Sequence, residues 1–233
     1  MVDLVFSPGW FYGKDIIIDA VSIVVLTLLS YFTFRCYRST KKKEHLWFSI
    51  AMGLLSLSFL FKILTNFTLY QHVLATRNLG LFTITYHTVV ENEALEIIGT
   101  MVYRLLSLLG LYTLFSLYYK QQDRASIILI IYFIIITTYF TSAAYYVFHI
   151  TSLLLLVFIL LHYHHNYCHT KDRFAKLVYI SFGIIALSQL IFIFLRINLF
   201  LYPIAETIQL IGYLLLLLSF ILVRSHGRKK NTN

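Results

Sequence analysis

The sequence predicts an all-α membrane protein that crosses the bilayer seven times as one domain, residues 1–233. Two observations come from composition: 59% of the residues are hydrophobic and 12% are charged, whereas soluble domains carry about 25% charged residues. Mean hydropathy is +0.78. The third observation is a succession of apolar stretches near the roughly 20 residues that a spanning helix needs. These stretches cover residues 15–37, 46–70, 94–119, 125–142, 144–167, 174–199 and 203–223.

The first two expected helices begin beside aromatic residues. Trp10, Phe11 and Tyr12 precede the first helix and Trp47 opens the second, and such rings are enriched at membrane interfaces. The chain does not open with a basic segment, a short apolar stretch and a small-residue cleavage site, so we expect no removable signal peptide. The first apolar stretch is therefore expected to stay as a helix.

The third expected helix follows the longest connection, residues 71–93. Phe82, Ile84 and Tyr86 alternate there with polar residues, and alternation with a period of two is typical of a strand or hairpin. The sequence thus predicts a short strand over the outer face. Such a strand is either a lid on a site or a surface loop without function.

The last four expected helices differ in polarity. The fourth is the shortest and has no ionisable residue, whereas the fifth ends in a histidine-rich run. In that run His162, His165 and His169 fall on one helical face, which makes them weak candidates for a zinc site. Nearby basic residues and the lack of a carboxylate cluster favour anchoring at the interface instead. A basic tail, residues 224–233, follows the seventh helix.

Lysine and arginine set the expected orientation, because cytoplasmic loops retain them during insertion. Fourteen of the 19 Lys and Arg residues follow the first, third, fifth and seventh expected helices, all on one side. The sequence therefore predicts a multi-pass protein of the cell membrane with its N-terminus outside and its C-terminus in the cytoplasm. The net charge of +9 then reflects topology and not a nucleic-acid-binding surface.

An internal repeat relates the two halves of the chain. Adding 130 to a residue number pairs Ser22 with Ser152, Tyr37 with Tyr167, Thr40 with Thr170, Lys41 with Lys171, Gly53 with Gly183 and Ser58 with Ser188. At an offset of 113, the third expected helix aligns with the seventh, Gly99 on Gly212. The sequence thus predicts a parallel 3+1+3 repeat in which residues 15–119 and 144–223 flank a linker helix, 125–142.

Two resemblances bear on this layout. The 3+1+3 arrangement resembles that of SWEET-type transporters, whose two halves are parallel repeats. The proline-containing motifs of those transporters are missing here, so a sugar substrate is not implied. Residues 59–67, 103–110 and 205–213 resemble a group of small archaeal seven-helix membrane proteins with no assigned activity. That resemblance implies a membrane location and no chemistry.

Polar side chains inside the expected helices are the candidate binding residues. An ionisable side chain at mid-helix costs at least about 2.5–3.5 kcal/mol in a membrane, so it normally faces the bundle interior and a partner. We expect these residues to line a polar cavity that opens outward and is closed toward the cytoplasm. Alternatively, they are ion pairs that only hold helices in register. The candidates are Asp19, Lys62, Asn66, Glu96, Arg104, His149, Gln189, Arg196, Glu206 and Gln209.

The sequence therefore predicts a membrane protein that binds or translocates a small polar or zwitterionic molecule. Two alternatives stay open: a receptor that signals through a separate cytoplasmic protein, and a structural subunit of a membrane complex. No nucleotide-binding loop, nucleophile elbow or paired zinc motif is present, so neither an enzyme nor a cofactor is expected. Retinal is also not expected, because residues 203–223 contain no lysine for a Schiff base.

Overall fold

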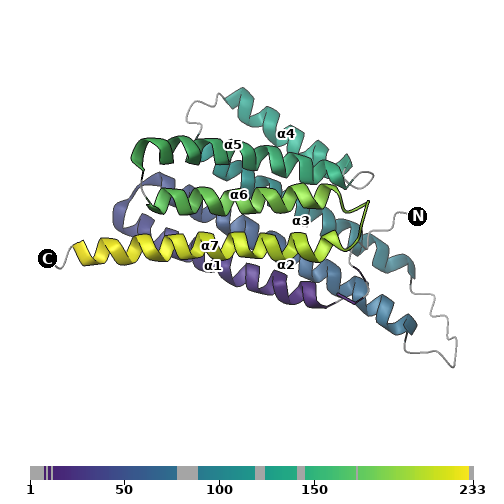
Figure 1. Ribbon diagram of the computed structural model, residues 1–233. Coiled ribbons are helices and arrows are strands. Elements are labelled where there is room, and N and C mark those ends of the chain that lie inside the picture. The colour runs from purple at the N-terminus through teal and green to yellow at the C-terminus, as the bar shows by residue number, and fades with distance from the viewer. Residues whose placement is uncertain are drawn as a thin grey trace.

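The computed structural model describes residues 13–77, 89–118, 124–140, 145–171 and 173–230 together with Pro8, Trp10 and Phe11. Within the helices, the side chains of residues 67–77, 89–96, 118, 124–127, 129, 170, 173–174 and 224–230 lie outside this description. All regular elements of the described residues are α-helices, which confirms the predicted all-α fold. They are α1 (Lys14–Thr40), α2 (Lys43–Arg77), α3 (Val89–Tyr118), α4 (Arg124–Phe140), α5 (Tyr146–Thr170), α6 (Arg173–Ile193) and α7 (Leu201–Lys230) (Figure 1).

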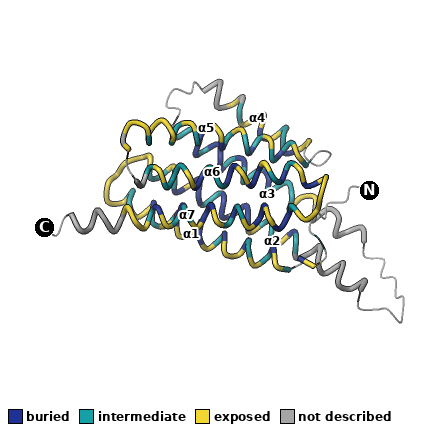
Figure 2. The backbone as a smooth tube through the Cα atoms, viewed as in Figure 1, coloured by how far each residue is buried: buried dark blue, intermediate teal, exposed yellow. Residues whose placement is uncertain are grey.

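Six of the described helices are long and apolar enough to cross a membrane: α1, α2, α3, α5, α6 and α7. The apolar part of α4 is shorter, Ile130–Phe140, and the whole helix has 17 residues, a rise of about 25 Å. Figure 2 shows buried and exposed residues alternating along the spanning helices, so each has an inward and an outward face. The chain is therefore a multi-pass membrane protein, and a seventh crossing by α4 stays a prediction.

The connection between α2 and α3 is shorter at both ends than predicted. α2 continues to Arg77 and α3 begins at Val89, whereas the sequence placed a connection over 71–93. Apolar periodicity alone did not reveal these extensions, because both carry polar residues. The predicted strand around Ile84 lies outside the described residues.

The boundary between α6 and α7 also differs from the prediction. α6 ends at Ile193, six residues before the predicted end, and the chain then forms turns up to Leu201. Asn198 stabilises these turns, since its Oδ1 accepts a hydrogen bond of 2.9 Å from the backbone N–H of Phe200. Asparagine favours such turns by bonding backbone two residues ahead. At the other end, α7 continues through the basic tail to Lys230.

Six helices form a closed ring. Among the described residues, α1 contacts α2, α2 contacts α3, α3 contacts α5, α5 contacts α6, α6 contacts α7 and α7 returns to α1. α4 contacts only α3 and α5 of these helices, from outside the ring (Figure 1). We name the two ends of the ring after residues that lie there. The Trp10 end is where α1, α5 and α7 begin, and the Lys171 end is where α2 and α6 begin.

Apolar side chains fill the interior of the ring, and small polar residues join its helices. Leu26, Leu29 and Ile159 are fully buried in the main core. Between α1 and α2, Thr27 Oγ1 lies 2.8 Å from Ser56 Oγ, and Ser30 Oγ donates to the carbonyl of Ser49 at 2.9 Å. Small residues of this kind let helices approach closely in a membrane, where lipid supplies little hydrophobic drive for packing.

Candidate functional site

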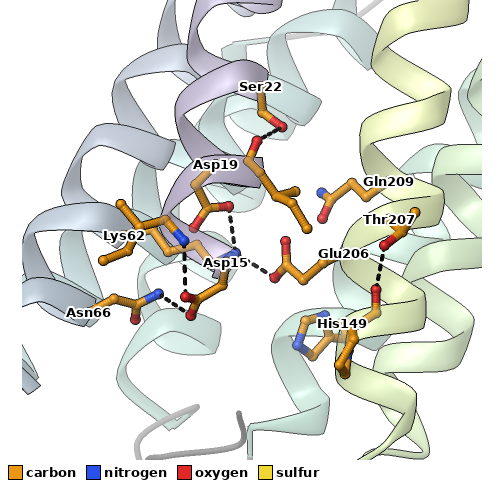
Figure 3. Close-up of polar contacts among 12 residues, drawn as sticks. Asp15, Asp19, Ser22, Lys62, Asn66, His149, Glu206, Thr207 and Gln209 are labelled. Carbon is orange, nitrogen blue, oxygen red and sulfur yellow. Dashed lines mark hydrogen bonds and ion pairs between the residues drawn. The ribbon is translucent and has the colours of Figure 1, made fainter. Parts of the chain in front are cut away.

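A lysine between two carboxylates lies inside the ring near the Trp10 end. Lys62 Nζ on α2 lies 2.9 Å from Asp19 Oδ1 on α1 and 2.5 Å from Glu206 Oε1 on α7 (Figure 3). The side chains of Asp19, Lys62 and Glu206 are 0%, 11% and 2% exposed. We call these three residues the charge cluster. It links three neighbouring helices of the ring by charge-assisted hydrogen bonds, the strong class of such bonds.

The spacing of polar residues along α1 and α2 explains why the charge cluster forms. Asp15, Asp19 and Ser22 are three or four positions apart and therefore share one face of α1, and all three are buried. Asn66 follows Lys62 by one turn of α2, and its Nδ2 donates to Asp15 Oδ2 at 3.3 Å. The second oxygen of Asp15 accepts from the backbone N–H of Ile16 at 2.9 Å. Two polar contacts about one helical turn apart, Asp19 with Lys62 and Asp15 with Asn66, thus join α1 to α2.

Asp19 is only half satisfied by these contacts. Its Oδ1 accepts from Lys62, whereas its Oδ2 is buried and has no hydrogen-bond partner among the described residues. Glu206 is satisfied by the same lysine through Oε1. A buried polar atom without a partner is costly, and such atoms are rare in folded proteins. Oδ2 of Asp19 therefore marks a position where a further hydrogen-bonding group or charge is favoured.

Aromatic residues close the ring over the charge cluster at the Trp10 end. Tyr202 lies with its ring centroid 6.0 Å from Lys62 Nζ, a distance that permits a cation–π contact. Its ring also contacts Phe11 and Phe192, with centroids 6.2 and 6.0 Å away. These rings belong to a buried apolar group, which we call the aromatic cap: Phe11, Phe192, Leu195, Tyr202 and Ala205.

A second polar pair lies beside the aromatic cap, between α5 and α6. His149 Nδ1 lies 2.9 Å from Gln189 Oε1, and the His149 ring stacks on Phe192 with centroids 4.8 Å apart and an interplanar angle of 17°. Phe192 in turn contacts Tyr202, so the aromatic cap connects this pair to the charge cluster. An uncharged His–Gln pair satisfies both polar side chains without placing a net charge in the membrane.

The remaining predicted residues are distributed unevenly. Gln209 is buried on α7 one turn after Glu206, and its Nε2 donates to the hydroxyl of Tyr213 at 3.1 Å. Arg104 is buried on α3. Glu96 belongs to α3, but its side chain lies outside the described residues. Arg196 follows the end of α6 and is exposed, so it does not line the interior of the bundle as predicted.

The histidine-rich run at the end of α5 lies far from the charge cluster, at the Lys171 end. The rings of His165 and His169 are 4.4 Å apart, and Cys168 Sγ approaches the ring of His164 at 3.8 Å. Among the described residues, no three His, Cys, Asp or Glu side chains come together as metal ligands would. Of the three weak metal candidates, His165 and His169 lie close together, and the described residues supply no third ligand to this pair.

An axial cavity of about 240 Å³ lies at the Lys171 end. All six ring helices contribute to its lining, through Leu29 and Thr33 on α1, Glu44, His45 and Phe48 on α2, Leu117 on α3, Tyr163 on α5, Val178 on α6, and Leu216, Ser219 and Phe220 on α7. Glu44 precedes Lys62 by 18 residues of α2, or about 27 Å of helix rise. The cavity and the charge cluster are therefore at opposite ends of the ring.

This cavity differs from the predicted one in place and in lining. The sequence predicted a polar cavity around the charged residues, whereas this cavity is lined mainly by apolar side chains and opens at the end that carries Lys41 and Lys171. The reason is that Asp19, Lys62 and Glu206 bind one another directly and leave no space between them. The alternative interpretation, helix registration, predicted ion pairs for Asp19, Glu96 and Glu206, and the structure shows such pairs for Asp19 and Glu206.

A layer of buried residues separates the cavity from the charge cluster. Leu26, Leu55, Phe59 and Tyr213, which we call the middle layer, all belong to the main core. The rings of Phe59 and Tyr213 meet edge to face with centroids 5.7 Å apart. Along the axis the order is thus aromatic cap, charge cluster, middle layer and cavity.

Sequence reasoning missed several residues of this arrangement. Tyr202 lay just outside the predicted seventh helix, and Phe59 and Phe192 carry no signal in a chain that is 17% aromatic. Asp15 and Tyr213 were not among the candidate binding residues, although helical spacing placed them on the same faces as Asp19 and Glu206. No protein-family model matches the chain, and no match was found among curated proteins or solved structures.

Proposed function

We propose that this chain is a membrane carrier that binds a small polar or zwitterionic molecule on the axis of the six-helix ring. The observation that supports this most is the order of features along that axis. A cavity lined by all six ring helices leads from the Lys171 end toward a buried cluster of both charge signs. Only the middle layer lies between them. A ligand that passes this layer reaches groups that can bind an anion and a cation.

The charge cluster is suited to exchanging its partners for those of a zwitterion. A ligand carboxylate can replace Asp19 or Glu206 on the ammonium of Lys62, and a ligand ammonium can then bind the carboxylate that is released. Each buried charge keeps a partner throughout this exchange. That matters because removing one partner of a buried pair is far more costly than replacing the pair.

Access from opposite sides follows from the two ends of the ring. The aromatic cap closes the Trp10 end, whereas the cavity is open at the Lys171 end. The positive-inside rule assigns the Lys171 end, with Lys41, Lys42 and Lys43, to the cytoplasm. The arrangement then corresponds to an inward-open carrier with its N-terminus outside, its C-terminus inside and α4 as the seventh crossing. Transport requires that the aromatic cap opens while the middle layer and the cavity close.

A parallel repeat supplies the two halves that such a movement needs. Among the six ring helices, the list of neighbours is unchanged when α1, α2 and α3 are exchanged with α5, α6 and α7. Hydrogen bonds recur at the offset of 130. Ser58 Oγ donates to the carbonyl of Leu55 and Ser188 Oγ to that of Ile185, each at 2.7 Å.

The helix ends repeat at the same offset. Lys41 and Lys171 both adopt positive φ, 57° and 49°, and their backbone N–H groups donate to the carbonyls of Tyr37 and Tyr167 at 2.7 and 2.8 Å. This conformation is unfavourable for residues other than glycine. Its recurrence at equivalent positions therefore supports a common origin for the two halves.

Packing favours a different register for α3 and α7 from the predicted offset of 113. A Cβ added to Gly110 would meet Leu55 and the carbonyl of Ala51, and one added to Gly212 would meet Ile185 and the carbonyl of Ser181. Leu55 and Ala51 are the counterparts of Ile185 and Ser181 at the offset of 130. Gly110, and not Gly99, thus corresponds to Gly212, which gives an offset of 102.

Uptake into proteoliposomes tests the carrier proposal. The purified chain is reconstituted and assayed with radiolabelled amino acids, betaines and organic acids. Val178→Phe fills the axial cavity and should abolish uptake, whereas Val157→Phe, on the exposed face of α5, should leave it unchanged. The neutral triple variant Asp19→Asn/Lys62→Met/Glu206→Gln removes all three charges together and should fold but not transport. Uptake that survives Val178→Phe or the triple variant would refute the proposal, as would no uptake of any compound.

A further inference from the structure

We propose that the charge cluster is a proton-binding site, in which one exchangeable proton is held by the carboxyl groups of Asp19 and Glu206. This proposal rests on the proposed function in so far as the proton would be the coupling ion of the same site. Proton binding is, however, an equilibrium property of the folded protein, and it can be measured without transport.

The first step is a count of charge. With all three groups ionised, the two carboxylates and one ammonium leave the charge cluster with a net charge of −1 inside the membrane. The other described groups around it do not supply a balancing cation: Asp15 on α1 adds a negative charge, and Tyr202 and Tyr213 on α7 and Tyr103 on α3 are neutral phenols. Gln189 on α6 and the paired His149 on α5 are polar groups beyond the aromatic cap.

Arg104 is the other buried cation among the described residues. It belongs to α3, and α3 contacts neither α1 nor α7 in the described part of the chain. The charge cluster itself holds two ion pairs, those of Lys62 with Asp19 and Glu206. One proton on either carboxyl group would make the cluster neutral.

The second step is the unsatisfied oxygen. Asp19 Oδ2 is buried without a hydrogen-bond partner among the described residues, so an ionised Asp19 would keep negative charge on an oxygen that no donor stabilises, although its Oδ1 is paired with Lys62. Protonation removes that charge and needs no additional space. A metal ion such as Na⁺ would need room for several oxygen ligands, whereas Lys62 Nζ already lies 2.9 Å from Asp19 Oδ1 and 2.5 Å from Glu206 Oε1.

The third step is a route for the proton. Glu206, Gln209 and Tyr213 lie at helical spacing on the inner face of α7, and Ser219 follows six residues later. All four are buried, Gln209 and Tyr213 are hydrogen-bonded, and Ser219 lines the axial cavity. Polar groups thus extend from the charge cluster into the middle layer, and residues 214–218, all leucine, lie between Tyr213 and Ser219, while the aromatic cap covers the other side.

Infrared difference spectroscopy of the purified full chain tests this proposal, because a protonated carboxyl group has a C=O stretching band separate from those of carboxylates. We expect one such band at neutral pH, lost on alkaline titration with the uptake of one equivalent of base. Glu206→Gln and Asp19→Asn should each remove or shift it. Glu44→Gln, at an exposed carboxylate near the cavity mouth, is the matched control and should leave the band unchanged.

Stability provides a second readout that does not depend on the band. Each single amide variant mimics the protonated cluster and should unfold at a temperature that no longer varies with alkaline pH, whereas the double variant Asp19→Asn/Glu206→Gln leaves Lys62 without a counter-charge and should be less stable than either. No carboxylic band at neutral pH, or a band that Na⁺ removes, would overturn the proton site. A band without any substrate uptake would instead refute the carrier proposal and leave the proton site intact.

Discussion

The two halves of the proposed repeat bring side chains together at the same spacing along the chain but with different chemistry. Asp19 on α1 meets Lys62, 43 residues later in the chain, with 2.9 Å between Oδ1 and Nζ. His149 on α5 meets Phe192, also 43 residues later, by stacking at 4.8 Å between ring centroids. The backbone arrangement therefore decides which positions meet, and the residue types decide whether the contact is an ion pair or an aromatic stack.

The third member of each group extends this comparison. In the proposed α3–α7 register, which pairs Gly110 with Gly212, Glu206 corresponds to Arg104. The group on α1, α2 and α7 thus has two anions that both contact one cation, whereas the corresponding group on α5, α6 and α3 has a histidine, a phenylalanine and an arginine. Charge that must be balanced is concentrated between α1, α2 and α7, and substitutions there should have the largest effects.

The largest expected effect is that of Lys62→Met. It leaves two carboxylates buried together without a cation, and breaking a buried pair in this way costs about 3–5 kcal/mol. Phe192→Leu, the equivalent position of the other half, should cost less, about 1–2 kcal/mol, because it removes only apolar contacts. Thermal unfolding in detergent, followed by circular dichroism, measures both. Lys176→Met, which removes an exposed lysine of α6, is the control, and equal losses for Lys62→Met and Phe192→Leu would contradict the comparison.

A smaller loss of stability is expected for substitutions at Gly110 and Gly212, where the two proposed halves carry the same residue. An added Cβ would lie 2.9 Å from Leu55 Cγ at Gly110 and 2.5 Å from Ile185 Cγ1 at Gly212. Gly110→Ala and Gly212→Ala should each lower stability by about 1–3 kcal/mol through overpacking. Gly53→Ala is the control, because its Cβ would meet Ser30 Oγ at an ordinary 3.5 Å. If Gly110→Ala were harmless while Gly212→Ala was not, the proposed register of α3 and α7 would be incorrect.

Substitutions in the neutral pair of His149 and Gln189 should lower stability less than substitutions in the charge cluster. Gln189→Leu removes the partner of His149 Nδ1 and should cost about 1–2 kcal/mol, since a half-buried polar atom loses its hydrogen bond. The double variant His149→Leu/Gln189→Leu removes both polar groups and should recover part of that loss. A double-mutant cycle on unfolding temperatures measures this coupling. A double variant that loses the sum of both single effects would show that the pair is not coupled.

Helix number and the polar faces could be predicted from the sequence, because both follow from local periodicity. The 3.6-residue spacing of Asp15, Asp19 and Ser22 predicted one face of α1, and that face is buried. The identity of each ion pair could not be predicted, since Glu96 and Glu206 offer the same charge to Lys62. Choosing between them requires the packing of α1 against α7, which joins residues nearly two hundred positions apart.

The end of α6 and the position of the cavity depend on interactions that the spacing of apolar residues does not reveal. Apolar residues continue through Leu199, and the turn at Asn198 comes from one side-chain hydrogen bond to the backbone. The cavity forms because the eleven side chains that line it, from six helices, do not fill the space along the ring axis. Its position therefore depends on the combined volumes of side chains that are far apart in the sequence. The charged residues were expected around a cavity because their mutual pairing was not visible in the sequence.

The smallest expected effect concerns the polar contact nearest the Trp10 end, which again differs between the halves. Asn66 Nδ2 donates to Asp15 Oδ2 at 3.3 Å, whereas at the offset of 130 the backbone N–H of Arg196 donates to the hydroxyl of Tyr145 at 3.0 Å. Asn66→Leu therefore removes a side-chain donor and should lower stability by about 1 kcal/mol. Arg196→Leu keeps its backbone bond and should leave the unfolding temperature unchanged. A loss on Arg196→Leu that equals or exceeds that of Asn66→Leu would mean that the exposed guanidinium, and not only the backbone, stabilises the turn between α6 and α7.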